Sequence, residues 1–121
     1  GRLHSLKKVR FYRNQLTHLP DSIGDLKSLE ELDLRYNQLT TLPSSMSRLK
    51  NLKKLRLGHN RLILFPRFLC FLPKLRVVQL NHNRIQRLPP CFQRLGKLRY
   101  VNLYGNPVYE RWNRRRKPRK R

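Results

Sequence analysis

The stretch that decides the fold is Leu29–Leu52, which reads LEELDLRYNQLTTLPSSMSRLKNL. Its asparagine, Asn37, has counterparts spaced 23 positions apart along the chain: Asn14, Asn60, Asn83 and Asn106. Around each asparagine the apolar residues keep one phase, with a pair at i and i+2 in front of it. A Leu-Pro or Phe-Pro follows five residues after each of the first four asparagines. The chain is therefore organised by an internal repeat of 23 residues.

Each repeat predicts one short strand and one short helical turn. Apolar residues at i and i+2, such as Leu32 and Leu34, indicate a strand with one buried face. After each Leu-Pro the apolar positions recur every three residues, which is typical of a helical turn. Strands that always return in the same direction form a parallel sheet. We expect each asparagine amide to hydrogen-bond the backbone of its own turn and that of the neighbouring coil.

The pattern L-x-x-L-x-L-x-x-N-x-L-x-x-L-P-x-x-I-x-x-L resembles the leucine-rich repeat family in its 23-residue form, from Leu3 to Val108. The resemblance implies an α/β solenoid with a parallel concave β-sheet and short helical or 3-10 turns on the convex side. We expect four repeats plus a fifth strand in residues 1–108, without a visible N-terminal cap, and a basic C-terminal arm in residues 109–121. Tyr109 and Trp112 are available to cover the last coil, and the tail 111–121 has no hydrophobic period and cannot fold alone. Similar repeats occur in intracellular scaffolds and in ribosome-associated proteins.

Composition points to a partner that carries negative charge. The 121 residues suffice for one compact domain, and 29 Lys and Arg against 6 Asp and Glu give a formal charge of +23. Self-repulsion of this size makes an isolated monomer a poor working state. A hydrophobic content of 38% argues against disorder, and no apolar run is long enough for a membrane-spanning helix.

The sequence gives no reason to expect catalysis, a cofactor, a metal or a small-molecule substrate. It contains no Ser-His-Asp set, glycine-rich phosphate loop or C-x-x-C motif. His59 and His82 share a phase and should lie side by side, but two imidazoles make a poor metal site. Cys70 and Cys91 lie two positions out of phase, which disfavours a disulfide and, with it, favours a reduced intracellular compartment.

Positive charge collects on the rim that leads into the strands and in the C-terminal arm. A phosphate backbone could follow such a stripe, so these residues are our candidates for RNA or polyanion binding. They are Lys50, Lys53, Lys74, Arg76, Lys97, Arg99, Arg111, Arg114, Arg115, Arg116, Lys117, Arg119, Lys120 and Arg121. The arm also fits a nuclear-import signal or an anchor to anionic lipid.

The outward residues of the strands divide the hollow into two parts. In the first three repeats the signs alternate, as in Lys8–Glu31–Lys54 and Arg10–Asp33–Arg56, which predicts ion pairs across strands. The later part is neutral and rich in tyrosine and asparagine, as protein-binding surfaces are, although the same aromatic side chains could also stack on unpaired bases. Its candidate protein-binding residues are Gln79, Asn81, His82, Tyr100, Asn102 and Tyr104.

A second candidate protein-binding patch lies on the convex side. Four apolar residues of the third repeat stand where the preceding repeat has polar ones: Ile63, Leu64, Phe68 and Phe71. An exposed apolar patch marks a protein interface. The alternative is that Tyr109 or Trp112 folds back and covers it.

These observations favour a non-catalytic scaffold that contacts RNA, with neighbouring proteins, in a ribonucleoprotein assembly. A mitochondrial or cytosolic ribosome fits best, and the nucleus is a further option. The alternative is a protein-interaction module of a signalling or scaffold protein, with the basic tail as a localisation signal.

Overall fold

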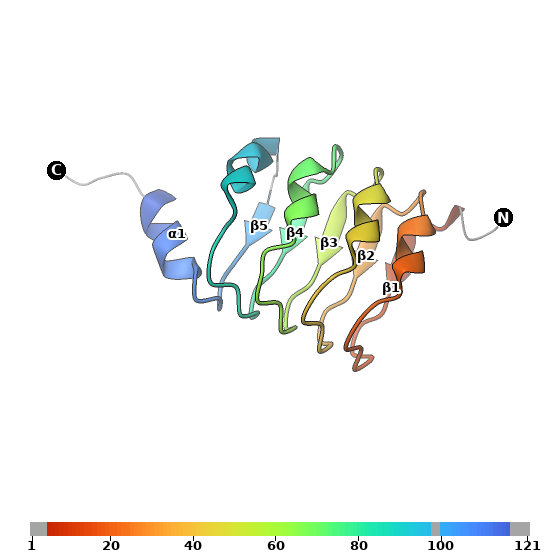
Figure 1. Cartoon of the computed structure of the whole chain (residues 1–121), viewed down its shortest axis with the longest axis horizontal. Coiled ribbons are helices and arrows are strands. Elements are labelled where there is room, and N and C mark those ends of the chain that lie inside the picture. Colours follow the sequence, from red (N-terminus) through yellow and green to blue (C-terminus); the bar gives the residue numbers. More distant parts are fainter. Residues whose placement is uncertain (1–4, 98–99, 117–121) are drawn as a thin grey trace.

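The computed structural model describes residues 5–97 and 100–116, which form a single row of stacked coils (Figure 1). Each coil contributes one strand: β1 (Lys8–Arg10), β2 (Glu31–Asp33), β3 (Lys54–Arg56), β4 (Val77–Gln79) and β5 (Tyr100–Asn102). The 3-10 turns between the strands are η2 (Asp21–Asp25), η3 (Ser44–Arg48), η4 (Arg67–Phe71) and η5 (Pro90–Lys97). The helix α1 (Tyr109–Arg116) follows β5. The predicted alternation of strand and turn is confirmed.

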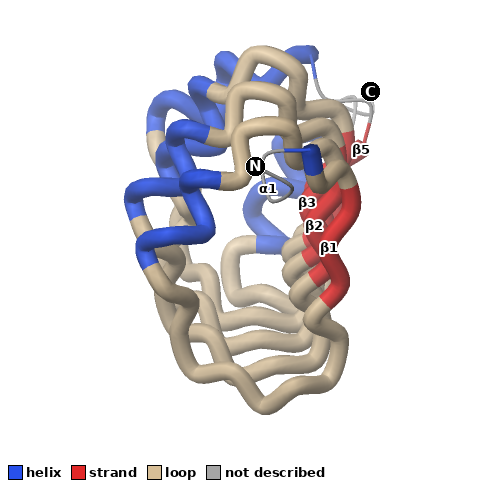
Figure 2. Tube along the Cα trace, turned by 90° about the vertical axis from the view of Figure 1, so that its right-hand side faces the viewer, coloured by secondary structure: helices blue, strands red, loops and turns tan. Residues whose placement is uncertain are grey.

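The five strands form one parallel sheet in chain order, and their register follows the repeat. Val9 pairs with Leu32, Leu32 with Leu55, and so on to Val78 and Val101, each 23 residues further along. Figure 2 looks along the stack and shows the sheet on one side and the helical turns on the other. Residues 23 apart therefore lie side by side on neighbouring coils.

The core fills the space between the sheet and the turns. The inward leucines of the middle coils, such as Leu34, Leu49, Leu52 and Leu57, are completely buried. Each removes its side chain from water, which stabilises the fold by roughly 2 kcal/mol per residue. Since every coil has its apolar residues in the same phase, the core runs through the whole stack.

The buried asparagines bind neighbouring coils together. The Oδ1 of Asn60 accepts a hydrogen bond from the backbone N–H of Leu39 at 3.0 Å, and its Nδ2 donates to the carbonyl of Leu34 at 2.9 Å and to that of Leu57 at 3.1 Å. Asn83 and Asn106 repeat these contacts one and two coils further along. The predicted structural role is confirmed for Asn37, Asn60, Asn83 and Asn106, whereas the side chain of Asn14 in the first coil is exposed.

The helix α1 covers the C-terminal end of the core. Tyr109 and Trp112 lie one turn apart and pack against the last coil. The backbone N–H of Trp112 donates to the backbone carbonyl of Val108 at 3.1 Å. The prediction that Tyr109 and Trp112 cover the last coil is therefore confirmed, whereas the prediction that the tail has no fold of its own was wrong for residues 111–116, because these two aromatic side chains give the helix an apolar face. Residues 117–121 lie outside the described part. No helix in the described part is long and apolar enough to cross a membrane.

The N-terminal end differs from the C-terminal end. Among the described residues it keeps a hollow of about 650 Å³, lined by apolar side chains of the first coil that include Phe11, Leu16 and Leu26. Phe11 is exposed and Leu16 is half-buried. Within the described residues, this end therefore carries no covering element comparable to α1.

Cys70 and Cys91 form a disulfide between η4 and η5. The sequence-based prediction against this bond was wrong. Two residues advance a helical turn by only about 3–4 Å, so an offset of two positions between neighbouring turns leaves the Cα atoms within bonding range. They lie 5.9 Å apart, inside the range that a disulfide requires.

Candidate functional site

The outward charges of the first coils are largely paired with one another. Lys8 lies 3.4 Å from the carboxylate of Glu31, as predicted for facing strands. Asp33, however, binds Arg35 of its own coil through two side-chain contacts at 2.9 and 2.8 Å, rather than Arg10 or Arg56. Arg35 follows Asp33 by two residues in the same coil. Its guanidinium donates to both carboxylate oxygens, from Nε to Oδ1 and from Nη2 to Oδ2.

The environment of Asp33 favours its charged form. Burial alone would raise the pKa of this carboxyl group. The side-chain and backbone hydrogen bonds from Arg35, with the charges of Arg35 and Arg56, outweigh burial and hold the pKa below its ordinary value. The two acidic side chains of this part of the hollow, Glu31 and Asp33, are thus paired within the first coils, and Arg10, Lys54 and Arg56 leave the surface around them positively charged.

The later part of the hollow presents tyrosine and amide side chains. Tyr100 on β5 and Tyr104 just beyond it are 47% and 58% exposed, the most open tyrosines among the described residues. Gln79, Asn81 and Asn102 lie half-buried beside them. The structure therefore places the six predicted concave residues on two neighbouring coils, with His82 in ring contact with Tyr104 at 5.5 Å.

A row of stacked rings borders this surface, along the positions that precede the asparagines. Tyr36 stacks on His59 at 4.3 Å and His59 on His82 at 4.4 Å, with the guanidinium of Arg13 over Tyr36. The predicted neighbourhood of the two histidines is confirmed. The pKa of His59 lies below its ordinary value, mainly because of burial and also because of the charges of His82 and Arg13.

The ring row depends on an unusual backbone conformation. Arg13, Tyr36, His59 and His82 all have φ between 56° and 59°. At the next equivalent position Gly105 has φ 83°, and a Cβ there would lie 2.5 Å from Nδ1 of His82. The sequence signal for this row is the residue before each repeated asparagine, which places Arg13 and Tyr36 in one column with His59 and His82. Among the described residues no three metal-ligating side chains come together.

The predicted cation stripe is partly occupied by contacts within the chain. Lys53 lies 3.6 Å from the carboxylate of Glu30, and the Nζ of Lys74 donates to the amide oxygen of Asn51 at 2.7 Å. Lys50 and Arg76 are exposed. The side chain of Lys97 and the whole of Arg99 lie outside the described part.

The arm contributes two described cations on α1. Arg111 donates a hydrogen bond to the carbonyl of Gln86, which joins the helix to the preceding coil, and Arg114 is exposed. Arg115 and Arg116 belong to α1, but their side chains are not described. Lys117, Arg119, Lys120 and Arg121 lie outside the described residues.

The convex apolar patch divides into exposed and packed members. Leu64, Phe71 and Ile63 are 77%, 56% and 51% exposed. Phe68 is half-buried and packs against the core, so it contributes less surface than the sequence predicted. Trp112 does not cover the patch, since its ring contacts Phe92 at 6.2 Å.

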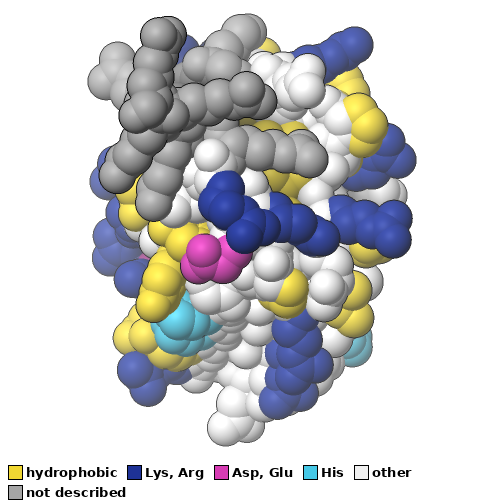
Figure 3. Space-filling view, turned by 90° about the vertical axis from the view of Figure 1, so that its left-hand side faces the viewer, with side chains coloured by type: hydrophobic (Ala, Val, Ile, Leu, Met, Phe, Trp, Pro, Cys, Tyr) yellow, Lys and Arg dark blue, Asp and Glu magenta, His cyan; other side chains and the backbone are white. Residues whose placement is uncertain are grey.

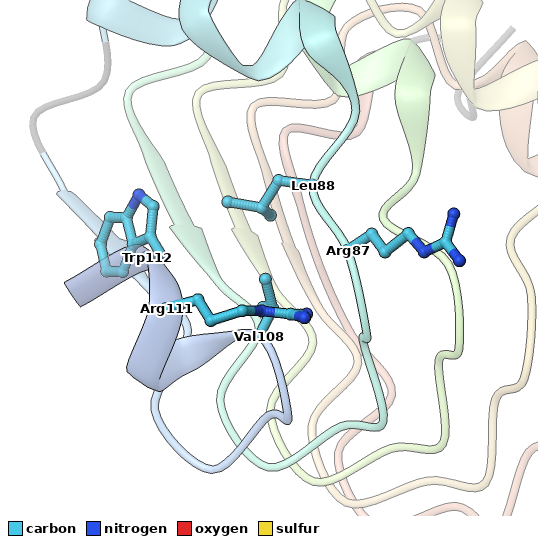
Figure 4. Close-up of a pocket in the computed structure, with 5 residues that line it drawn as sticks. All are labelled: Arg87, Leu88, Val108, Arg111 and Trp112. Atoms are coloured by element: carbon cyan, nitrogen blue, oxygen red, sulfur yellow. The ribbon is translucent and has the colours of Figure 1, made fainter. Parts of the chain in front are cut away.

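Sequence analysis missed a cleft between α1 and the loop that leads into η5. Its lining residues are Arg87, Leu88, Val108, Arg111 and Trp112, and its volume is about 290 Å³ (Figure 4). The sequence signal was weak because these residues come from two separated segments, and the helix that brings them together had not been predicted.

Comparisons with known proteins agree with this geometry. A sequence profile of the leucine-rich repeat matches residues 2–62, half of the chain, and a second leucine-rich repeat profile matches residues 74–95. No curated protein matches the sequence at a significant level.

Two solved structures share the fold. The chain is similar to a leucine-rich repeat protein of Leptospira interrogans, with 36% identity and a TM-score of 0.82 over 87% of this chain. It is also similar to an internalin, inlF, of Listeria monocytogenes, with 29% identity and a TM-score of 0.75 over 84% of this chain. The chain spans 27% and 29% of these two longer chains. With a profile match over half of its length and one strand, one asparagine and one turn in each coil, the chain belongs to the leucine-rich repeat family.

Proposed function

We propose that this chain is a non-catalytic protein-interaction module whose partner binds on the concave face of β4 and β5. The observation that carries the proposal is the contrast within that face. In the first coils the acidic side chains of this face are held by cations of the same coils, whereas in the last coils Tyr100 and Tyr104 are exposed beside half-buried amides.

Tyrosine and asparagine suit such a surface for physical reasons. Tyrosine supplies a large contact area at a low cost in conformational entropy, and it is enriched among the residues that dominate binding energies. Val77 and Gln79 of β4 lie in register with Tyr100 and Asn102 of β5, so the patch is continuous across two strands.

The charge of the chain indicates an acidic partner. The neutral patch borders β3, which carries Lys54 in register with Val77 and Arg56 in register with Gln79. With a formal charge of +23, the chain attracts negatively charged proteins at long range and repels positively charged ones.

The test compares two alanine variants that remove the same chemical group from opposite ends of the hollow. Proteins captured from an extract by the wild-type chain are quantified against a Tyr100→Ala/Tyr104→Ala variant and a Tyr12→Ala control. A true partner should bind the double variant at least about tenfold less tightly and the control nearly as tightly as the wild type. Equal capture by all three chains would contradict the proposal, since charge alone would then explain the binding.

Contact with RNA remains a second proposal, favoured by the net charge and the exposed rim cations Lys50 and Arg76. If six cations contact single-stranded RNA, a plot of log K against log[salt] should have a slope of about −4. Removing residues 111–121 and neutralising Arg76 and Arg99 should flatten that slope. If the slope is shallow in the intact chain, or the affinity unchanged after these deletions, the RNA and ribosome proposals fail and the protein-interaction proposal stands.

A further inference from the structure

We infer that the cleft between α1 and the preceding coil is a binding site for an acidic peptide segment of a partner protein, with an apolar side chain in the cleft and a carboxylate on its arginines. The inference uses the proposed function only in taking the partner to be a protein. The site lies on a different surface from the concave patch and stands or falls separately.

The lining of the cleft combines an apolar floor with positive charge. Leu88, Val108 and Trp112 supply the floor, and Arg87 and Arg111 supply the charge. None of the described residues that line it is acidic. Figure 4 shows the side chain of Arg111 running beneath Leu88 towards Val108, while that of Arg87 points outward from the opposite wall. A volume of about 290 Å³ is enough for one large apolar side chain.

The cleft is held in shape by contacts on both walls. Arg111 donates to the carbonyl of Gln86, and the N–H of Val108 donates to the carbonyl of Ile85 at 3.0 Å. The ring of Trp112 packs edge-on against Phe92 at 6.2 Å. Since the site is formed without a ligand, binding requires little ordering of the protein, and that favours affinity.

The exposed apolar residues of the third coil extend the site. Leu64 precedes Arg87 by 23 residues, so it lies beside Arg87 on the neighbouring coil, with Ile63 next to it. Two coil spacings separate Leu64 from α1, about 10 Å at roughly 4.8 Å per spacing. A peptide in polyproline II conformation covers that distance in about three residues, and its side chains at i and i+3 lie on the same face. A peptide segment that fits this site therefore has apolar residues at i and i+3. The acidic residues between them lie over Arg87.

The shape of the site favours a peptide over a membrane or a nucleic acid. A bilayer surface is too flat to fill a cleft, and a phosphate backbone has no apolar group for its floor. The surface around α1 carries many Lys and Arg side chains and only a small acidic area (Figure 3). Polyanions will therefore approach this end of the molecule, and the apolar floor selects among them.

The test uses Trp112, the only tryptophan of the chain, as a fluorescent reporter inside the site. The full chain is titrated, at physiological salt, with the peptide acetyl-Glu-Leu-Glu-Glu-Phe-Glu-amide. Two control peptides replace either all glutamates by glutamine or both apolar residues by serine. We expect a saturable change with the first peptide and binding at least about fivefold weaker with each control.

Variants then locate the binding. Arg87→Gln should weaken the first peptide about fivefold, whereas the control Arg10→Gln, at the opposite end of the molecule, should leave it unchanged. Circular dichroism of both variants verifies that they fold. Equal binding of the three peptides, or equal loss in the two variants, would overturn the inference, since either result means unspecific attraction. A uridine decamer that changes the fluorescence more strongly than the peptide would overturn it in favour of RNA.

A concave variant separates this inference from the proposed function. The single variant Tyr100→Ala should bind the peptide as the wild type does; Tyr104 is kept because its ring contacts Tyr109 of α1 at 5.4 Å. If it loses the peptide, the binding belongs to the concave face and the cleft is excluded, while the proposed function is supported. If the concave variant keeps the peptide but also keeps every protein partner, the proposed function fails and the cleft remains.

Discussion

The first two coils and the last two are built on the same repeat, yet they differ in everything that points outward. The first coils hold five of the six acidic residues, three of which pair with Lys8, Arg35 and Lys53, and among the described residues they end in an apolar hollow. The last coils have exposed tyrosines, a disulfide and a covering helix. The comparison teaches that the inward residues maintain the structure of each coil, whereas the outward residues can differ without disturbing it. One end of the stack can therefore be specialised for binding.

The largest effect should come from an inner asparagine compared with the outermost one. Asn60→Ala leaves several buried backbone groups of two coils without partners, which should lower the free energy of unfolding by about 3 kcal/mol. Asn14→Ala changes an exposed side chain at the open end and should cost less than about 0.5 kcal/mol. Urea denaturation measures both. Equal losses would show that the first coil is as tightly bound as the middle ones.

The disulfide should contribute nearly as much, and it acts on the third and fourth coils, which it joins. It closes a loop between cysteines 21 residues apart, for which loop entropy predicts about 3 kcal/mol. A Cys70→Ala/Cys91→Ala variant should therefore unfold at a lower urea concentration than the wild type. Dithiothreitol should destabilise the wild type to a similar extent and leave the variant unchanged; insensitivity of the wild type would contradict the bond.

The two ends of the stack should respond differently to loss of an aromatic ring. Trp112→Ala removes the contact with Phe92 from the covered end and should cost about 2 kcal/mol, measured by thermal unfolding followed by circular dichroism. Phe11→Ala, at the open end, should cost less than about 1 kcal/mol because its ring is already exposed. A larger loss for Phe11→Ala would reverse our view of which end is covered.

Asp33 should make the first coils sensitive to acid. Because its pKa in the folded chain lies below the ordinary 3.8, the stabilisation is present above that pH and is lost as the pH falls through the folded pKa. At neutral pH, Asp33→Asn should cost about 1 kcal/mol. The difference between wild type and variant should shrink below pH 3.8, as followed by urea denaturation at several pH values. A difference that stays constant down to the acid limit would exclude this role.

The smallest effect should come from His59 in the ring row. Its folded pKa lies below the ordinary 6.5, so the unfolded chain binds the proton more readily and stability falls as the pH drops through 6.5 towards the folded pKa. His59→Gln should flatten the stability profile in that range, whereas His18→Gln, on an exposed loop of the first coil, should leave the slope in place. If the slope is unchanged in His59→Gln, the pH dependence of stability in this range comes from another group.

Much of the fold could be predicted because it follows from one short-range rule repeated along the chain. The positions of Leu55, Asn60 and their counterparts define strands, turns and register, and the structure agrees with each of them. The neighbourhood of His59 and His82 followed from the same arithmetic. The candidate site was harder to predict from the sequence, because Trp112 is brought close to Arg87 by a helix that has no counterpart in the repeat.

By itself, the sequence determined the stack and its core, because a coil with buried leucines and a buried asparagine has only one way to exclude water and satisfy its backbone. The tertiary structure alone decided that Asp33 pairs with Arg35, that Cys70 reaches Cys91, and that α1 covers the last coil. These choices depend on how long side chains and a terminal helix reach their neighbours in space. For Asp33, the free energies of alternative ion pairs at the surface differ by about 1 kcal/mol or less, and the repeat pattern does not encode such a difference.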